Sequence, residues 1–146
     1  MSLKTIKFEI VTPEQIVLKE AVIRATIPTT SGELTILPDH IPLVSVLRSG
    51  LIEVEKNNGE VEIMVISGGF LEVQSDKIII LADYAERAAS LDEEVIKSAQ
   101  VKAEKAKLDA KNRDDVEFTD ISARLEVELL KNKALSRWRK LKNPEK

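Results

Sequence analysis

Residues 51–65 have the sequence Leu-Ile-Glu-Val-Glu-Lys-Asn-Asn-Gly-Glu-Val-Glu-Ile-Met-Val, and this stretch sets the class of the first half of the chain. Apolar and polar residues alternate on either side of Asn58 and Gly59, which is the pattern of two half-buried strands. Asn-Gly between two such runs is the strongest short-range signal for a β-hairpin, because both turn residues need a positive φ. We therefore predict an antiparallel hairpin with positive φ at Asn58 and Gly59.

The same signals continue through the rest of residues 1–84. Alternation and β-branched runs predict further strands over residues 6–10, 15–19, 22–27, 33–37, 70–73 and 77–81. We interpret Gly68-Gly69 as a tight turn between strands. Short strands spaced by about eight to ten residues predict an antiparallel sandwich or flattened barrel, and the lack of intervening helices argues against a parallel sheet. The candidate core residues are Phe8, Ile10, Ile27, Leu43, Val65, Phe70, Val73 and Ile79.

The second half of the chain has a helical composition. Residues 85–143 contain neither glycine nor proline and are rich in Ala, Leu, Glu and Lys. The expected elements are a helix over residues 91–111, a polar turn at residues 112–115 and a second helix over residues 119–141. Ser90 and Glu93 have the spacing of a capping box at the start of the first helix. Two helices joined by about four polar residues fold back as an antiparallel hairpin.

The apolar stripe of the first helix is narrow and consists mainly of alanine. Its members are Leu91, Val95, Ala99, Ala103 and Ala106, and those of the second helix are Ala123, Val127, Leu130, Ala134, Trp138 and Leu141. A buried methyl group contributes only about 0.8 kcal/mol, which weakly offsets the entropy of ordering the hairpin. We therefore expect the hairpin to be able to leave its resting place, as a mobile regulatory arm must.

Composition limits the function. Residues 1–84 hold 7 Lys/Arg and 12 Asp/Glu, whereas residues 85–146 hold 15 and 13. The pI near 5.4 argues against nucleic-acid binding, which needs a basic surface. No run approaches the roughly 18 apolar residues that span a bilayer, so we expect no direct membrane insertion. The first seven residues lack the apolar core of a signal peptide, and the absence of cysteine suits a reducing compartment.

The sequence offers no convincing catalytic, metal or cofactor site. The only histidine is His40, and with no cysteine and no Gly-x-Ser-x-Gly elbow it lacks the partners of a catalytic triad. One histidine with scattered carboxylates is also a poor source of the three or four ligands that zinc requires. Neither glycine-rich phosphate-binding motif occurs. We predict a non-catalytic protein in which His40 is a loop or contact residue.

Cations gather near the end of the chain. Residues 131–146 contain seven Lys or Arg and one Glu, and the proposed regulatory cluster consists of Lys131, Lys133, Arg137, Arg139 and Lys140. One interpretation is a solvated helix end whose cations suit the negative end of the helix dipole. The other is attraction to an acidic partner or an anionic membrane. The charges alone leave both open.

Three motifs resemble a known family, the epsilon subunit of bacterial F-type ATP synthase. They are residues 32–43 (Gly-Glu-Leu-Thr-Ile-Leu-Pro-Asp-His-Ile-Pro-Leu), residues 67–73 (Ser-Gly-Gly-Phe-Leu-Glu-Val) and residues 81–83 (Leu-Ala-Asp). The first two together are highly specific, and their order, the chain length and the β-then-two-helix plan also agree. The resemblance implies a ten-stranded flattened antiparallel β-sandwich, here residues 1–85, followed by an antiparallel two-helix hairpin, here residues 86–146.

The resemblance also implies partners. The β domain of the family sits on the gamma subunit and touches the membrane rotor ring, and Glu33 and His40 fall at positions near both. The helices lie folded or extend along gamma toward the catalytic alpha and beta subunits, where they block ATP hydrolysis. The basic cluster then faces an acidic segment of beta. Such a subunit is peripheral, at the cytoplasmic face of the cell membrane.

Some family members bind regulatory ATP through an Ile/Leu-Asp-x-x-Arg-Ala motif. The matching segment here keeps Asp92 but has Val95 at the arginine position and Ile96 at the alanine position. Because the cation that would meet the phosphates is missing, we expect no tight ATP binding and no cofactor. The rival interpretations are a stand-alone β-sandwich adaptor module with a helical interaction tail, and a small-ligand enzyme. Co-purification with gamma separates the adaptor from the subunit.

Overall fold

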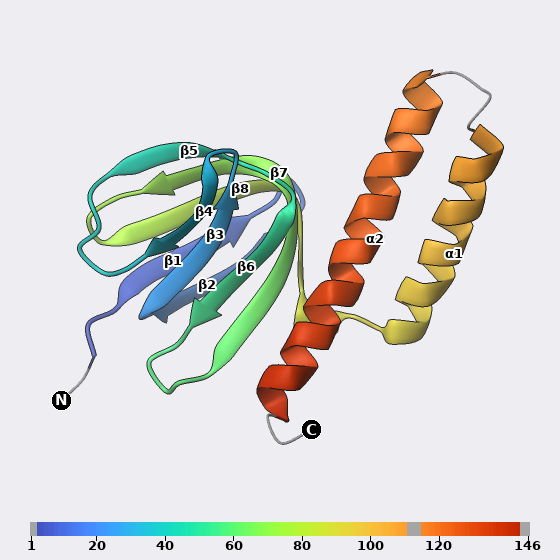
Figure 1. Ribbon diagram of the computed structural model, residues 1–146. Helices are drawn as coiled ribbons and strands as arrows, with labels where there is room; N and C mark the ends of the chain where they lie inside the picture. Colours follow the sequence, from blue (N-terminus) through green and yellow to red (C-terminus); the bar gives the residue numbers. More distant parts are fainter. Residues whose placement is uncertain (1–2, 111–114, 144–146) are drawn as a thin grey trace.

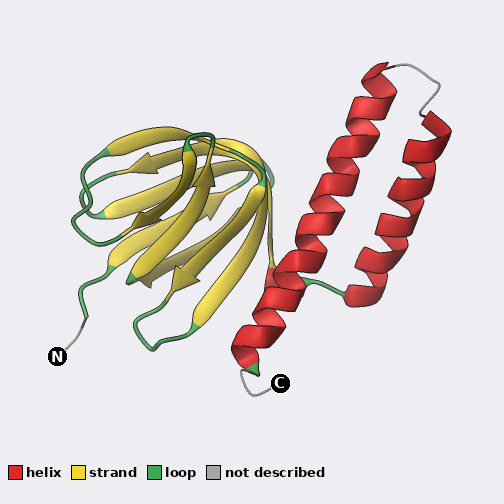
Figure 2. Cartoon of the chain, viewed as in Figure 1, coloured by secondary structure: helices red, strands yellow, loops and turns green. Residues whose placement is uncertain are grey.

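A β-sandwich and a two-helix hairpin lie side by side in the computed structural model, which describes residues 3–110 and 115–143 (Figure 1). The strands are β1 (Ile6–Val11), β2 (Ile16–Val22), β3 (Arg24–Thr29), β4 (Gly32–Ile36), β5 (Leu43–Leu47), β6 (Gly50–Glu55), β7 (Val61–Val73) and β8 (Lys77–Arg87). A short 3-10 helix, η1 (Ala88–Ser90), leads to the helices α1 (Glu93–Ala110) and α2 (Asp115–Lys142). Figure 2 shows all strands on one side of the molecule and both long helices on the other. The predicted β + α fold class is confirmed.

The sandwich is a single sheet folded into two layers by its two longest strands. The strand order is β2-β1-β8-β7-β5-β3-β4, and β6 pairs with both β3 and β7. The second half of β7 pairs with β5, and its first half pairs with β6 in the opposite layer. The resemblance implied ten strands, but the described residues form eight because β7 and β8 each run through both layers. One pair, β1 with β8, is parallel, and all others are antiparallel.

The glycine pair at residues 68–69 lies inside β7 and is not the predicted turn. Gly68 and Gly69 have φ values of 67° and 124°, and the pairing of β7 with β8 keeps the same register on both sides of them. A Cβ atom on Gly69 would overlap the carbonyl oxygen of Leu81 and lie 2.8 Å from Cα of Ala82. Glycine is therefore required here by a bend in a continuous strand and by a close backbone approach.

The predicted hairpin over residues 51–65 is present, with a different turn. The N–H of Gly59 donates to the carbonyl of Lys56 at 2.9 Å, and only Gly59, not Asn58, has a positive φ, of 84°. This is a three-residue loop in which a left-handed glycine follows the turn. The Asn58 side chain instead accepts a hydrogen bond from the N–H of Glu60 at 2.9 Å.

The main core fills the space between the two layers. Its largest fully buried side chains include Phe8, Ile6, Ile10, Ile27, Ile36, Ile52, Met64, Ile66, Leu71, Ile78 and Ile80. Of the predicted core residues, Phe8, Ile10, Ile27 and Val73 are confirmed, and Leu43 packs at the edge. Phe70 is exposed, Ile79 is half-buried and Val65 belongs to a second cluster. These differences follow from strand alternation, which turns the three side chains to the outer faces of the layers.

The start of α1 differs from the prediction. Oδ1 of Asp92 accepts from the N–H of Glu94 at 2.9 Å and, at 3.4 Å, from that of Val95, so Asp92 caps the helix. The predicted Ser90–Glu93 capping box is wrong, because Ser90 belongs to η1. The predicted turn at residues 112–115 lies mostly outside the described residues, and α2 begins at Asp115.

The apolar stripes of the helices are only partly as predicted. Val95 is 64% exposed, and its neighbour Ile96 is buried instead. On α2, Ala134 is buried and Leu130 and Trp138 are half-buried, whereas Ala123 and Leu141 are exposed.

Candidate functional site

The hairpin docks on the outer face of the sandwich through the C-terminal half of α2. Ile63 and Val65 of β7, Ala88 of η1 and Ala134 of α2 form a small buried cluster. The half-buried side chains around it are Leu51, Val61, Tyr84, Leu91, Leu130 and Trp138. Leu130, Ala134 and Trp138 recur every fourth residue, so one narrow stripe of α2 faces the sheet. The main packing partner of α1 is α2.

The rest of the space between hairpin and sandwich is incompletely filled. An open cavity of about 590 Å³ lies between α1, α2 and the sheet. Its apolar lining comes largely from Ala99, Ala103 and Ala106 of α1 and from Ile121 and Val127 of α2. The small alanine side chains of α1 therefore leave space between the hairpin and the sheet.

Arg137 of the predicted regulatory cluster ties α2 to β6. Its Nε donates to Oε2 of Glu53 at 2.8 Å. The hydrogen bond from Arg137 to Glu53, with a smaller contribution from the charge of Glu33, raises the pKa of Arg137. Glu33, Glu53 and Arg137 line one polar cavity of about 230 Å³. The structure thus brings a predicted partner-contact residue, Glu33, close to the regulatory cluster.

Arg139 ties the end of α2 to the start of α1. Its guanidinium lies 2.9 Å from the carboxylate of Glu93, which also pairs with Lys97 at 3.1 Å. Arg139 first and Lys97 second lower the pKa of Glu93. Because the two residues are 46 positions apart, this pair closes the open end of the hairpin near the sandwich.

Lys131 lies over the ring of Tyr84 on β8, with its Nζ 5.2 Å from the ring centroid. The same Nζ is 3.2 Å from Glu128 and 3.8 Å from Glu86. Burial lowers the pKa of Lys131, but Tyr84 and Glu128 outweigh this effect and the pKa is raised. The Tyr84 hydroxyl in turn donates to Glu86. A cation, a phenol and two carboxylates therefore lie together where α2 meets β8.

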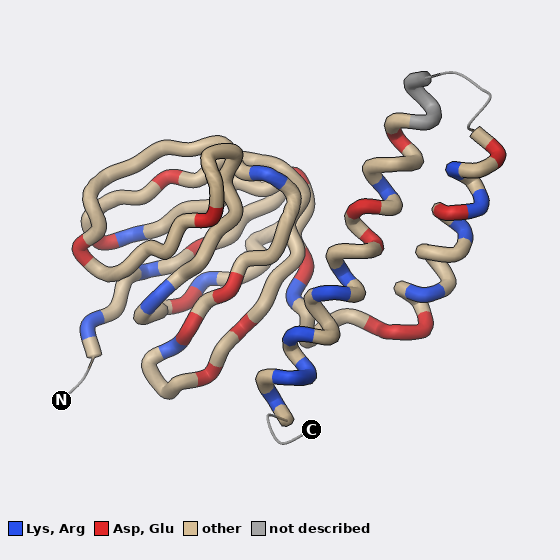
Figure 3. Tube along the Cα trace, viewed as in Figure 1, with Lys and Arg blue, Asp and Glu red and all other residues tan. Residues whose placement is uncertain are grey.

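The other two cations of the cluster, Lys133 and Lys140, differ from these three in their surroundings. Lys133 lines a cavity of about 420 Å³ together with Leu130 and Arg137. Within residues 3–110 and 115–143, neither Lys133 nor Lys140 takes part in an ion pair. Figure 3 shows the cations gathered along the C-terminal part of α2, beside the sandwich. The five residues are therefore grouped in space but differ in their partners.

The two predicted partner-contact residues, Glu33 and His40, lie in different parts of the β4–β5 segment. Glu33 is exposed on β4, and His40 is in the loop between β4 and β5. Nδ1 of His40 is 2.7 Å from the carbonyl oxygen of Ile41. Asp39, before it, has a φ of 67° and pairs with Lys4. These contacts hold the loop and give His40 no nucleophile to activate.

An uncovered apolar row crosses the outer face of the layer that lies away from the helices. Val46 of β5 pairs with Phe70 of β7, Phe70 with Leu81 of β8, and Leu81 with Val11 of β1. Phe70 is 57% exposed, and Val46 and Leu81 are similarly exposed. Cross-strand neighbours on one face lie in direct contact distance, so these side chains form a continuous strip. A strip of this kind is typical of a protein–protein interface.

The described residues contain no cluster of three or more His, Asp or Glu side chains arranged to hold a metal ion. Within the same part of the chain, no helix combines the length and the apolar character needed to cross a membrane.

Comparison with known proteins identifies the fold. Residues 5–88 match the family model for the β-sandwich domain of the ATP synthase delta/epsilon chain. The chain belongs to the ATP synthase delta/epsilon family. The predicted resemblance to the epsilon subunit is thereby confirmed.

Relatives within this family match most of the chain. The ATP synthase epsilon chain of Desulforamulus reducens is 39% identical over 129 residues, which cover 88% of this chain and 96% of the relative. That of Dichelobacter nodosus is 49% identical over 96 residues, which cover 66% and 67%. A chain of the Euglena gracilis mitochondrial ATP synthase structure (OSCP/F1/c-ring) has a TM-score of 0.76 at 26% identity, covering 92% of this chain and 84% of that one. A chain of the Tetrahymena thermophila central stalk and c-ring structure, at 16% identity and a TM-score of 0.59, shares the fold.

The sequence analysis missed three residues of this site, Glu53, Tyr84 and Glu86. It assigned a fourth, Glu93, to a capping box rather than to the ion pair with Arg139. Glu53 and Glu86 lie on different strands, and only the fold brings them to α2. The available signal was alternation, which puts Glu53 on the same face of β6 as Leu51.

Tyr84, the only tyrosine of the chain, reports on the docking of α2. Burial first, and the hydrogen bond to Glu86 second, raise the pKa of Tyr84 to about 12. The folded pKa exceeds the ordinary tyrosine pKa of 10.0, so the stabilisation is present below pH 10 and is lost as the pH rises through about 12. We predict that tyrosinate absorbance of the full chain titrates near pH 12, and near 10 after unfolding in urea. A folded-state midpoint near 10 would contradict this docking geometry.

Proposed function

We propose that this chain is a non-catalytic central-stalk subunit of an F-type ATP synthase, which couples ion movement through the membrane ring to ATP synthesis and restrains ATP hydrolysis through its helices. One observation carries the proposal. A β-sandwich of the delta/epsilon family presents a bare apolar row on one layer, and it holds a loosely attached, cation-bearing hairpin on the other. Family membership favours this role over that of a stand-alone adaptor.

The apolar row of Val46, Phe70 and Leu81 is the proposed seat of the gamma subunit. A permanent subunit contact requires an apolar centre, which this row supplies, and the helices leave it uncovered. Glu33 and the loop around His40 are the proposed contacts with the rotor ring and gamma. The chain itself then lies at the cytoplasmic face of the cell membrane and is held there by its partners.

Restraint of hydrolysis is proposed to come from the extended hairpin. In that state α2 leaves the outer face of β6 and β7, and the basic cluster meets an acidic segment of the catalytic beta subunits. The limited apolar contact and the unfilled cavity make departure possible at a modest free-energy cost.

The gamma contact predicts a specific loss of binding. Phe70→Glu places a charge at the centre of the row, and we expect its affinity for gamma to fall by about a hundredfold. Val101→Glu is the matched control, because Val101 is 63% exposed on α1, outside the row, and should bind as the wild type does. Binding is measured by titration with purified gamma, with circular dichroism as the check on folding. Equal affinities for the two variants would place the gamma contact elsewhere.

We also propose that the chain has no tight ATP site. Asp92 is engaged as the cap of α1, and Val95 offers no cation at the position where the family motif has arginine. Calorimetric titration with millimolar ATP should show no saturable binding. A micromolar dissociation constant would contradict the proposal and point to Lys102 and Arg124, which line the nearby cavity.

A further inference from the structure

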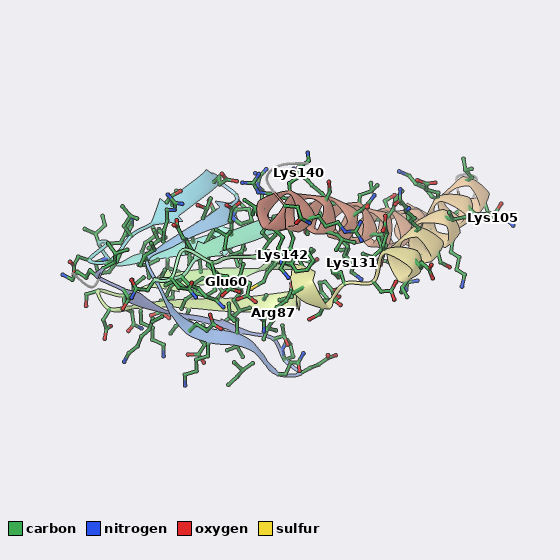
Figure 4. All side chains as sticks on the ribbon, turned by 90° about the horizontal axis from the view of Figure 1, so that it is seen from below. Glu60, Arg87, Lys105, Lys131, Lys140 and Lys142 are labelled. Atoms are coloured by element: carbon green, nitrogen blue, oxygen red, sulfur yellow. The ribbon has the colours of Figure 1, made fainter. Side chains whose placement is uncertain are left out.

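The basic cluster of α2 is divided by its partners in the folded state. Lys131, Arg137 and Arg139 each face a carboxylate on a different element: Glu86 on β8, Glu53 on β6 and Glu93 on α1. Within the described residues neither Lys133 nor Lys140 forms an ion pair, although Lys133 lines the same cavity as Glu33 and Glu53. Figure 4 labels Lys131 at the junction of α2 with the sandwich and Lys140 nearer the end of the helix.

These three acids sit around the apolar contact rather than within it. Glu53 lies two residues from Leu51 on the same face of β6, and Glu86 lies two residues from Tyr84 on β8. Glu93 begins α1, next to the half-buried Leu91. An apolar strip with a rim of carboxylates is complementary to a helix that carries an apolar stripe flanked by cations, as α2 does.

We propose that Glu53, Glu86 and Glu93 form an intramolecular latch that competes with the acidic partner for the cations of α2. The latch rests on the proposed function, because it assumes that the same cluster meets acidic residues when the hairpin extends. In the folded state the three acids pair with Arg137, Lys131 and Arg139. Lys131 also pairs with Glu128 of its own helix, and Glu93 with Lys97. Extension exchanges these internal carboxylates for external ones.

The latch gives the five cations unequal roles. A group shifts a conformational equilibrium only by the difference between its interactions in the two states. Lys131, Arg137 and Arg139 have a carboxylate partner in both states. Removing one of them therefore destabilises both states by similar amounts and leaves the equilibrium between folded and extended hairpin nearly unchanged. Lys133 and Lys140 form an ion pair only in the extended state, so removing them destabilises that state alone. Per charge, loss of Lys133 and Lys140 should therefore relieve inhibition more than loss of Arg137 and Arg139.

The size of the effect follows from the exposure of the pairs. An exposed ion pair changes an equilibrium constant by at most about fivefold, so three together change it by on the order of tenfold or more. Salt screens such pairs and leaves the apolar contact intact. The latch therefore adjusts the fraction of molecules in which the hairpin is docked. The packing of Trp138 and Leu130 keeps part of that docking free energy when the ion pairs are screened.

Trp138, the only tryptophan of the chain, supplies a direct readout in the isolated full-length protein. We expect Glu53→Gln/Glu86→Gln/Glu93→Gln to shift its emission to longer wavelength and to increase the undocked fraction about tenfold. The matched control is Glu55→Gln/Asp83→Asn/Glu94→Gln, which removes the same charge from the same three elements. Of these three, Glu55 pairs with Arg24 inside the sandwich. The control should keep the wild-type emission.

Two further measurements separate loss of the latch from loss of the fold. Far-ultraviolet circular dichroism reports whether the variants remain folded, and Glu53→Gln/Glu93→Gln leaves β8 untouched and should give a smaller shift in the same direction. Wild-type emission from the latch variant, or an equal shift in latch and control variants, would overturn the latch.

Inhibition of ATP hydrolysis in a gamma-containing catalytic subcomplex separates the latch from the proposed function. We expect the latch variant to inhibit at about tenfold lower concentration than the wild type and the control variant. If its emission shifts while inhibition stays unchanged, the latch stands and the inhibitory role of the hairpin fails. If its emission stays unchanged, the latch fails whatever the hydrolysis rate.

Discussion

The contact between the C-terminal half of α2 and the outer face of β6 and β7 governs how the two parts of this chain relate. Ile63 and Val65 offer the sheet side of that contact, and Ala134 with its half-buried neighbours offers the helix side. Because α1 packs mainly on α2, its position beside the sandwich depends on α2. On the proposed function, the small apolar contact rather than any hinge sequence lets the hairpin detach, and the proposed latch sets how often it does.

The long strand β7 places the docked hairpin and the apolar row on different layers of the sandwich. The first half of β7 presents Ile63 and Val65 to α2, and beyond the glycine bend the second half presents Phe70 on the other layer. One strand therefore serves two surfaces on opposite sides of the molecule. Beyond it, Arg87 at the end of β8 pairs with the buried carboxylate of Glu62, to which Lys56 also lies 3.2 Å away. These pairs fix the point from which the hairpin leaves the sheet.

Local pattern predicted the fold class and most elements, and non-local contacts account for what it missed. Alternation around Asn58-Gly59 was enough for the hairpin, because both strands carry their own signal. Gly68-Gly69 was misjudged as a turn, since only the register with β8 shows a bent, continuous strand. Ser90 and Asp92 both suit a helix cap, and the η1 turn decides between them. The basic cluster was found by composition, but its division into latched and free cations depends on carboxylates such as Glu53, 84 positions from Arg137.

On the proposed function, the sandwich binds its partners alone and restraint of hydrolysis resides in a hairpin held by one small contact. A fragment of residues 1–90 keeps all of β8 and η1 and lacks both helices. This fragment can be compared with the full chain as an addition to a gamma-containing catalytic subcomplex, with binding and ATP hydrolysis recorded together. We predict that the fragment binds gamma as tightly as the full chain and leaves hydrolysis unrestrained. A fragment that binds and still inhibits as strongly as the full chain would contradict it.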